Sequence, residues 1–249
     1  MANNRLWVVA HRGASGHAPE NTMAAFRAAV EMGARFIETD LQLTRDARVI
    51  AIHDTTLDRT TNGHGPVHLK TLEEIRELDA GGWFGPSGAA SFAGEHVPTL
   101  GEILGFAEQH DVNFYLEIKA GVTWGAEHAV VAAVRDLKAV PRVVILSFDP
   151  SALDTVYRLD ETIMTGFLCE YPAGDLVERA VRLGARQLAP RGDLVTPALV
   201  KKAHDAGLQV VTWTINEPEQ MLRLMDAGVD GIMTDFPDRL VRVVHESGG

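Results

Sequence analysis

Short β-branched or apolar runs recur along the chain at spacings that leave room for a helix between them. This spacing is typical of βα units, because parallel strands need a long crossover connection. The eight runs are residues 6–10, 36–43, 113–118, 143–148, 162–168, 186–189, 209–215 and 231–234. Helix-like patterns between them cover residues 21–31, 124–137, 173–183, 197–206 and 217–226. We therefore expect a fold of the α/β class.

Glycines mark the ends of four predicted helices. Gly33, Gly184, Gly207 and Gly228 each follow a helix-like segment and precede a strand, as suits a left-handed helix cap. Eight βα units in 249 residues match the size of a (β/α)8 TIM barrel, with a doubly wound open sheet as the alternative. No GxGxxG motif follows a strand, so dinucleotide binding on an open sheet has no support. We expect a single barrel domain over residues 1–249.

A ninth run, residues 49–52, follows the run 36–43 too closely for a parallel crossover. An antiparallel hairpin is expected, with Leu43 opposite about Arg48 and His53 opposite Glu38 or Thr39. Residues 54–112 then form an insertion between this strand 2 hairpin and strand 3, with a helix-like piece at 72–78. The insertion either shapes substrate access or is a solvated decoration.

Charge and cysteine content narrow the functional classes. The net charge of -11 argues against nucleic acid as a partner. A single cysteine, Cys169, excludes an internal disulfide and a thiolate zinc cluster. There is no basic start followed by a sustained apolar run, and no stretch long enough to span a bilayer. We expect a cytoplasmic protein without stable membrane insertion, whose oligomeric state the sequence leaves open.

Three carboxylates are expected to face the barrel interior. Strand alternation in FIETDLQLT sends Glu38 and Asp40 to one face, and NFYLEIK adds Glu117 on the neighbouring strand. Buried carboxylates need a cation. Three oxygen ligands without a thiolate favour one divalent cation, Mg²⁺ or Ca²⁺ with Mn²⁺ as a further candidate. The alternative is an internal salt bridge with Lys119 or Arg12.

A histidine and an arginine follow the first predicted strand directly. His11 and Arg12 therefore lie where a barrel exposes catalytic groups, and the hairpin brings His53 to the same site. Imidazoles move protons near neutral pH, and arginine binds phosphate through two donors. Beside a metal ion, this set suits acid–base hydrolysis of a phosphodiester.

The motifs resemble the glycerophosphodiester phosphodiesterase family over nearly the whole chain. They are HRG, PENT at 19–22, ETD, LT, HD, LDRTTNG, LEIK, SFD, WTIN and GIMTDFPD, in this order. The resemblance implies a (β/α)8 barrel with an insertion. It also implies cleavage of a glycerophosphodiester into an alcohol and sn-glycerol 3-phosphate, in which the glycerol 2-hydroxyl attacks first and forms a cyclic phosphate.

The same resemblance implies a role for each candidate residue. His11 and His53 are the catalytic pair. Glu38, Asp40 and Glu117 hold the divalent cation. Arg12 and Lys119 contact phosphate. Trp213 is either a core residue of its strand or, as the resemblance suggests, a wall for glycerol or the leaving alcohol.

Two other functions are compatible with these motifs. A lysophospholipase D-like hydrolase needs an apolar groove, for which Trp83, Phe84 and Phe92 in the insertion are the candidates. A catalytically silent phosphodiester-binding protein is the second alternative, since a fold does not guarantee chemistry. Glu170 is a candidate additional metal ligand, whereas Cys169 is interpreted as a buried residue rather than a nucleophile.

Overall fold

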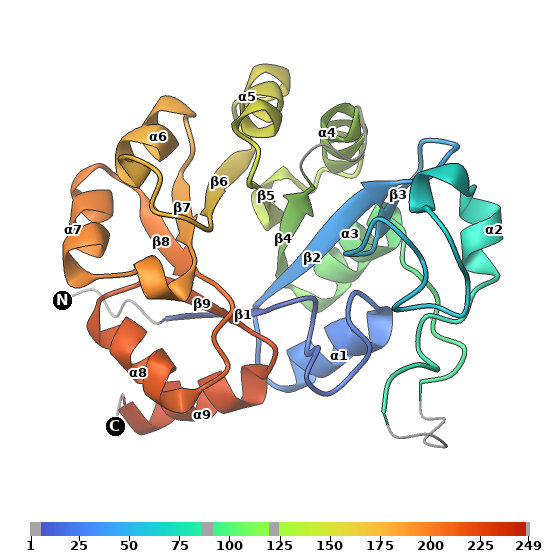
Figure 1. Cartoon of the computed structure of the whole chain (residues 1–249), viewed down its shortest axis with the longest axis horizontal. Coiled ribbons are helices and arrows are strands. Elements are labelled where there is room, and N and C mark those ends of the chain that lie inside the picture. The colour runs from blue at the N-terminus through green and yellow to red at the C-terminus, as the bar shows by residue number, and fades with distance from the viewer. Residues whose placement is uncertain (1–5, 86–91, 120–124, 248–249) are drawn as a thin grey trace.

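The computed structural model describes residues 6–85, 92–119 and 125–247, which form a closed parallel barrel (Figure 1). Its strands are β1 (Trp7–Ala10), β2 (Phe36–Leu43), β4 (Asn113–Ile118), β5 (Val143–Ser147), β6 (Met164–Cys169), β7 (Gln187–Pro190), β8 (Gln209–Thr212) and β9 (Gly231–Thr234). Strand β1 pairs in parallel with both β2 and β9, which closes the ring. The predicted (β/α)8 TIM barrel is confirmed.

Helices surround the strands on the outside of the barrel, except α2, which lies in the insertion beyond β3 (Figure 1). They are α1 (Met23–Glu31), α2 (Leu72–Arg76), α3 (Leu100–His110), α4 (Ala126–Asp136), α5 (Pro150–Leu159), α6 (Leu176–Arg182), α7 (Pro197–Asp205), α8 (Pro218–Asp226) and α9 (Pro237–Ser247). Single 3₁₀ turns occur at Val67–Leu69, Val140–Arg142 and Gly192–Leu194. Helices α3, α5 and α9 were not among the segments predicted as helical. Trp124, the predicted start of α4, lies outside the described residues.

The two faces of β2 separate apolar from charged side chains, as the alternation predicted. Ile37 and Leu41 are buried against the helical layer in a cluster with Phe26 and Phe114. A second cluster fills the barrel interior and includes Val9, Tyr115, Leu146, Leu168, Val211 and Met233. The interior is therefore packed with apolar side chains beneath the charged residues of β2.

Left-handed glycines return the chain from helix to strand. The φ angles of Gly33, Gly184, Gly207 and Gly228 lie between 66° and 90°, a region in which a side chain would be strained. Each residue follows the last turn of a barrel helix, so the predicted caps are confirmed.

Strand β3 (Val49–Ala51) pairs with β2 in antiparallel register and lies outside the ring of parallel strands. On its other side, Ile50 forms an isolated bridge with Thr99. Leu43 is opposite Val49, one residue beyond the predicted Arg48. Continuing this register places His53 opposite Thr39, one of the two expected partners. The hairpin therefore carries His53 back along β2 toward its carboxylates.

The segment 54–112 contains two different parts. Its first part has a small core of its own, in which Leu57, Ile75 and Val97 pack on Ile50 of β3. Its last part is α3, whose apolar face joins the main core of the barrel. Helix α3 is therefore the helix of an ordinary βα unit, and the true insertion ends before it, near Thr99. Within the described ranges, no helix combines the length and the apolar character that crossing a bilayer requires.

Candidate active site and metal centre

A pocket opens at the carboxyl ends of the parallel strands, where barrels carry their functional groups. Its lining comes from strands around the whole ring and from the β3 hairpin. The lining residues are His11, Arg12, Glu38, His53, Glu117, Lys119, Leu146, Phe148, Leu168, Glu170, Trp213, Thr214 and Met233. Seven of the eight predicted site residues line this pocket, and the eighth, Asp40, is buried beside it.

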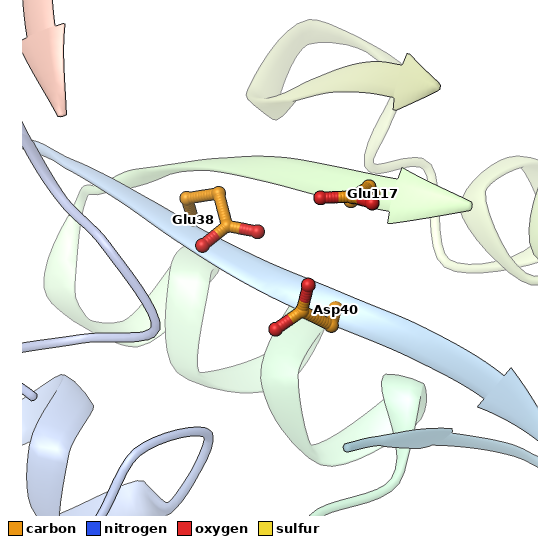
Figure 2. Close-up of side chains that lie close together, drawn as sticks. All are labelled: Glu38, Asp40 and Glu117. Atoms are coloured by element: carbon orange, nitrogen blue, oxygen red, sulfur yellow. The ribbon is translucent and has the colours of Figure 1, made fainter. Parts of the chain in front are cut away.

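Three carboxylates meet on the strand pair β2 and β4 (Figure 2). Glu38 and Asp40 project from β2 toward Glu117 of β4, and Asp40 is in register with Glu117. One oxygen from each lies within 4.8 Å of the others, and all three residues are buried. Among the described residues, no other group of three histidine, cysteine or acidic side chains has this proximity.

Two cations partly neutralise these carboxylates. Lys119 Nζ lies 2.6 Å from Asp40 Oδ1 and 2.7 Å from Glu117 Oε1, and Arg12 Nε lies 3.2 Å from Asp40 Oδ2. The Arg12 backbone N–H donates to Glu38 Oε2 at 3.0 Å. Glu38 Oε1 is buried and has no partner among the described residues. The expected internal salt bridges are therefore present, but they leave one buried oxygen unsatisfied, which fits a bound cation.

The protonation of the cluster follows from burial and mutual repulsion. Burial, together with the charge of Asp40, raises the pKa of Glu38 to about 8. The same two causes raise the pKa of Glu117. Burial alone would raise the pKa of Asp40 as well, but attraction to Lys119 and Arg12 holds it below its usual range. Without a further cation, the cluster therefore retains a proton on Glu38 near neutral pH.

His11 is held by an acidic residue that follows the last strand. Its Nδ1 lies 2.7 Å from Asp235 Oδ1, and its Nε2 lies 3.9 Å from Glu38 Oε2. Ser15 Oγ and Asn216 Nδ2 also donate to the Asp235 carboxylate. Burial opposes protonation of His11, but the hydrogen bond to Asp235 and the charge of Glu38 outweigh it and raise the pKa. The ring is thereby oriented with Nε2 toward the carboxylate cluster.

His53 reaches the pocket from the end of the β3 hairpin. Its Nδ1 lies 2.7 Å from Asp54 Oδ1, and the Asp54 carboxylate also accepts from Arg59. Burial lowers the pKa of His53, and the repulsion of Lys119 and Arg12 adds to this effect. The two histidines thus share one arrangement, a carboxylate at Nδ1, and differ in the direction of their pKa shifts.

The segment after β1 carries Arg12 and also the polar residues that hold Arg12 and Asp40 in place. Arg12 and Asn21 have φ angles of 56° and 57°, which non-glycine residues rarely adopt. Asn21 Nδ2 donates to Asp40 Oδ2 at 2.9 Å, and Glu20 Oε1 accepts from Arg12 Nη1 at 2.9 Å. Thr22 caps α1. The PENT segment therefore begins a helix and also supports the site.

One wall of the pocket is apolar. The ring of Trp213 meets Phe148 edge-on at 5.3 Å, and its Nε1–H donates to the Ala189 carbonyl at 2.7 Å. Leu146, Leu168 and Met233 continue this wall. Glu170 lies at the rim, 3.7 Å from Arg191, and is not part of the carboxylate cluster. Burial raises the pKa of the Cys169 thiol to about 12, so it lacks the acidity of a nucleophile.

Comparison with known proteins shows which family of barrel proteins this chain resembles. The glycerophosphoryl diester phosphodiesterase family matches residues 11–239. A glycerophosphodiester phosphodiesterase of Caldanaerobacter subterraneus subsp. tengcongensis is 40% identical over 243 residues, covering 97% of this chain and 98% of the relative. The chain belongs to the glycerophosphodiester phosphodiesterase family. The family and the enzyme class expected from the motifs are thereby confirmed.

Two solved structures extend the match of this phosphodiesterase family member to three dimensions. A Silicibacter pomeroyi protein, described as a putative glycerophosphoryl diester phosphodiesterase, superposes with a TM-score of 0.88 at 33% identity, covering 98% of this chain and 94% of the other. A phosphodiesterase of Oleispira antarctica, solved in complex with the product sn-glycerol-3-phosphate, has a TM-score of 0.87 at 29% identity. That comparison covers 96% of each chain.

Sequence patterns missed two residues that this phosphodiesterase site uses to hold its histidines. Asp235 is distant from His11 in sequence, and only closure of the barrel brings the two together. Its position directly after the last strand, in TDFPD, was the available signal. Arg59 lies in an irregular segment six residues after His53. No strand or helix periodicity there indicates which way its side chain points.

Proposed function

We propose that this chain hydrolyses glycerophosphodiesters to an alcohol and sn-glycerol 3-phosphate, using one divalent cation and the histidines His11 and His53. One observation carries the proposal: a buried three-carboxylate cluster with an unsatisfied Glu38 oxygen lies between two histidines, each held at Nδ1 by a carboxylate. The product seen in the Oleispira antarctica structure supports the same reaction.

The charges of the site fit a cation and an anionic substrate together. With all three carboxylates ionised, as cation binding would require, Arg12 and Lys119 leave an excess of one negative charge, which a divalent ion would reverse. Glu38, Asp40 and Glu117 would hold this ion, and oxygen ligands suit Mg²⁺, Ca²⁺ or Mn²⁺. When bound, it would polarise a phosphate oxygen and stabilise charge that develops in the transition state.

Arg12 and Lys119 are the residues proposed to contact the phosphate. Both residues line the pocket, and both form ion pairs with Asp40 of the carboxylate cluster. Their guanidinium and ammonium groups would stabilise the additional negative charge of a five-coordinate phosphorus. Ion pairs with the carboxylate cluster already hold both side chains in place, so neither has to be reoriented when the substrate binds.

The histidines account for the proton transfers. One imidazole Nε2 removes the proton from the glycerol 2-hydroxyl as this oxygen attacks phosphorus, and the other protonates the departing alcohol oxygen. The product of this step is a cyclic glycerol phosphate. In the second step the roles are exchanged, water opens the ring, and sn-glycerol 3-phosphate results. The Nδ1 carboxylates Asp235 and Asp54 hold each ring in the orientation that this exchange requires.

The pocket wall favours a small substrate. Trp213 and Phe148, packed edge to face, offer an apolar wall against which we place the glycerol backbone. The aromatic residues of the insertion are Trp83, Phe84 and Phe92. They pack edge to face on one another and do not line the pocket, so lysolipid hydrolysis gains no support from them. We propose a small polar glycerophosphodiester as the substrate. We also propose a cytoplasmic location, with which a chain that has no internal disulfide is compatible.

The test is release of sn-glycerol 3-phosphate from glycerophosphocholine by metal-stripped protein, with Ca²⁺, Mg²⁺ or Mn²⁺ added back separately. Restoration by one ion in the wild type, and its loss in Glu38→Gln, would connect the cluster to the reaction. No release with any ion from folded protein would refute the proposal. Binding of the intact diester without turnover would then favour a silent binding protein.

A further inference from the structure

Arg59 lies between two carboxylates and is hydrogen-bonded to both through its fork of donors. Its Nε and Nη2 donate to Asp54 Oδ2 at 2.7 Å and Oδ1 at 3.0 Å. Its Nη1 and Nη2 donate to Glu20 Oε2 at 2.7 Å and Oε1 at 2.8 Å. Across the described ranges, no other arginine has both oxygens of two separate carboxylates as partners.

Each of these carboxylates also contacts a residue that the proposed reaction uses. Asp54 Oδ1 is 2.7 Å from His53 Nδ1. Glu20 Oε1 is 2.9 Å from Arg12 Nη1, and Arg12 Nε in turn reaches Asp40. One continuous set of ion pairs therefore runs from His53 through Arg59 to Arg12. It joins the β3 hairpin to the turn after β1, two segments that lie on either side of β2 in the sheet.

The local backbone holds Arg59 at this junction. Leu57 is buried in the small core of the insertion, and the Thr61 N–H and hydroxyl both donate to its carbonyl. This closes a turn with Arg59 at its centre. The Arg59 side chain is 44% exposed, whereas that of Glu20 is only 13% exposed. The guanidinium therefore covers the carboxylates from the solvent side without entering the pocket.

We propose that Arg59 is a positioning residue that fixes the orientations of His53 and Arg12 together, through Asp54 and Glu20. This inference rests on the proposed function, in which both residues act on the phosphodiester. A planar guanidinium satisfies two bidentate partners at once, which the point charge of a lysine does not. Small misplacements of reacting groups are costly in rate, so the effect should appear mainly in kcat.

The first experiment compares Arg59→Lys with Arg76→Lys. Arg76 is a matched control, because it also binds a carboxylate, that of Glu102 at 2.7 and 2.8 Å, and has similar exposure on α2. We expect kcat of Arg59→Lys on glycerophosphocholine to fall roughly 10- to 100-fold with little change in Tm. Arg76→Lys should match the wild type. Wild-type kcat in Arg59→Lys would overturn the inference.

Chemical rescue separates positioning from a structural role. Arg59→Ala should lose at least as much activity as Arg59→Lys, and millimolar guanidinium should restore it several-fold by occupying the vacated place. Guanidinium should not raise the activity of the wild type or of Arg76→Ala. Loss of activity together with a large fall in Tm, and without rescue, would show that Arg59 serves only the stability of the insertion.

A readout independent of turnover keeps this inference distinct from the proposed function. The imidazole ¹⁵N shifts of His53 report how firmly Nδ1–H is held by Asp54, whatever reaction the protein catalyses. We expect these shifts to change in Arg59→Lys and to stay constant in Arg76→Lys. Unchanged shifts would refute the positioning role, whereas absent hydrolysis by the wild type would refute only the proposed function.

Discussion

Replacing Glu38 by glutamine should stabilise the metal-free protein while abolishing its use of a cation. The folded-state pKa of Glu38 is about 8, against an ordinary value of 4.5, so at pH 7 folding requires uptake of a proton that the unfolded chain has released. Each pH unit of this window is equivalent to about 1.4 kcal/mol, which gives at most ~3 kcal/mol at pH 7. The wild type should therefore lose stability as pH rises from 4.5 to 8, and this slope should be shallower in Glu38→Gln, in which Glu117 is the remaining cluster carboxyl with a raised pKa.

Glutamine fits the contacts that this argument requires. Its Oε1 can accept the Arg12 backbone N–H, and its amide can donate to the neighbouring carboxylates. Urea unfolding of metal-free protein between pH 4.5 and 8 measures the effect, and calorimetric titration measures the cation. Glu178→Gln, a surface residue paired with Arg182, is the control. A Glu38→Gln variant less stable than wild type at pH 7, or one that binds the cation with unchanged affinity, would refute the reasoning.

Three further outcomes are expected. His11→Ala and His53→Ala should each lower turnover by about 10²-fold or more with Tm retained, whereas His204→Ala on the surface should not. Asp235→Asn should lower the pKa of His11, because it removes the charge that favours the imidazolium; an NMR titration that finds the pKa unchanged would contradict this. Trp213→Ala should raise KM more than it lowers kcat, as measured by initial rates, if its ring only forms the wall of the pocket.

The sequence predicted the parts of the site that depend on local periodicity. Alternation along β2 separated Glu38 and Asp40 from Ile37 and Leu41, because the pleat fixes which side chains share a face. The short connection before β3 required a hairpin, and the hairpin determined the position of His53 to within one residue. These inferences use only distances of a few residues along the chain.

The parts that escaped prediction depend on contacts between distant segments. His11 and Asp235 are in contact but lie at opposite ends of the sequence. Arg59 lies in a turn that has no regular periodicity. All three missed helices did have local signals, which for α3 is the capping box of Thr99 and Glu102. Asp149 and Pro150 begin α5, and Pro237 begins α9, as N-cap and first-turn residues do. Both helices are short amphipathic segments, in which few apolar residues mark the buried face.

The closing contact between β1 and β9 has a consequence for how the protein acquires activity during folding. His11 and Asp235 are 224 positions apart, so their contact is among the most non-local in the molecule. Such contacts form late, since the entropy of closing a long loop must be overcome first. Helices and neighbouring strands can therefore assemble while the site is still incomplete. In a refolding time course, recovery of turnover should lag behind recovery of secondary structure, and it would report the moment at which the ring closes.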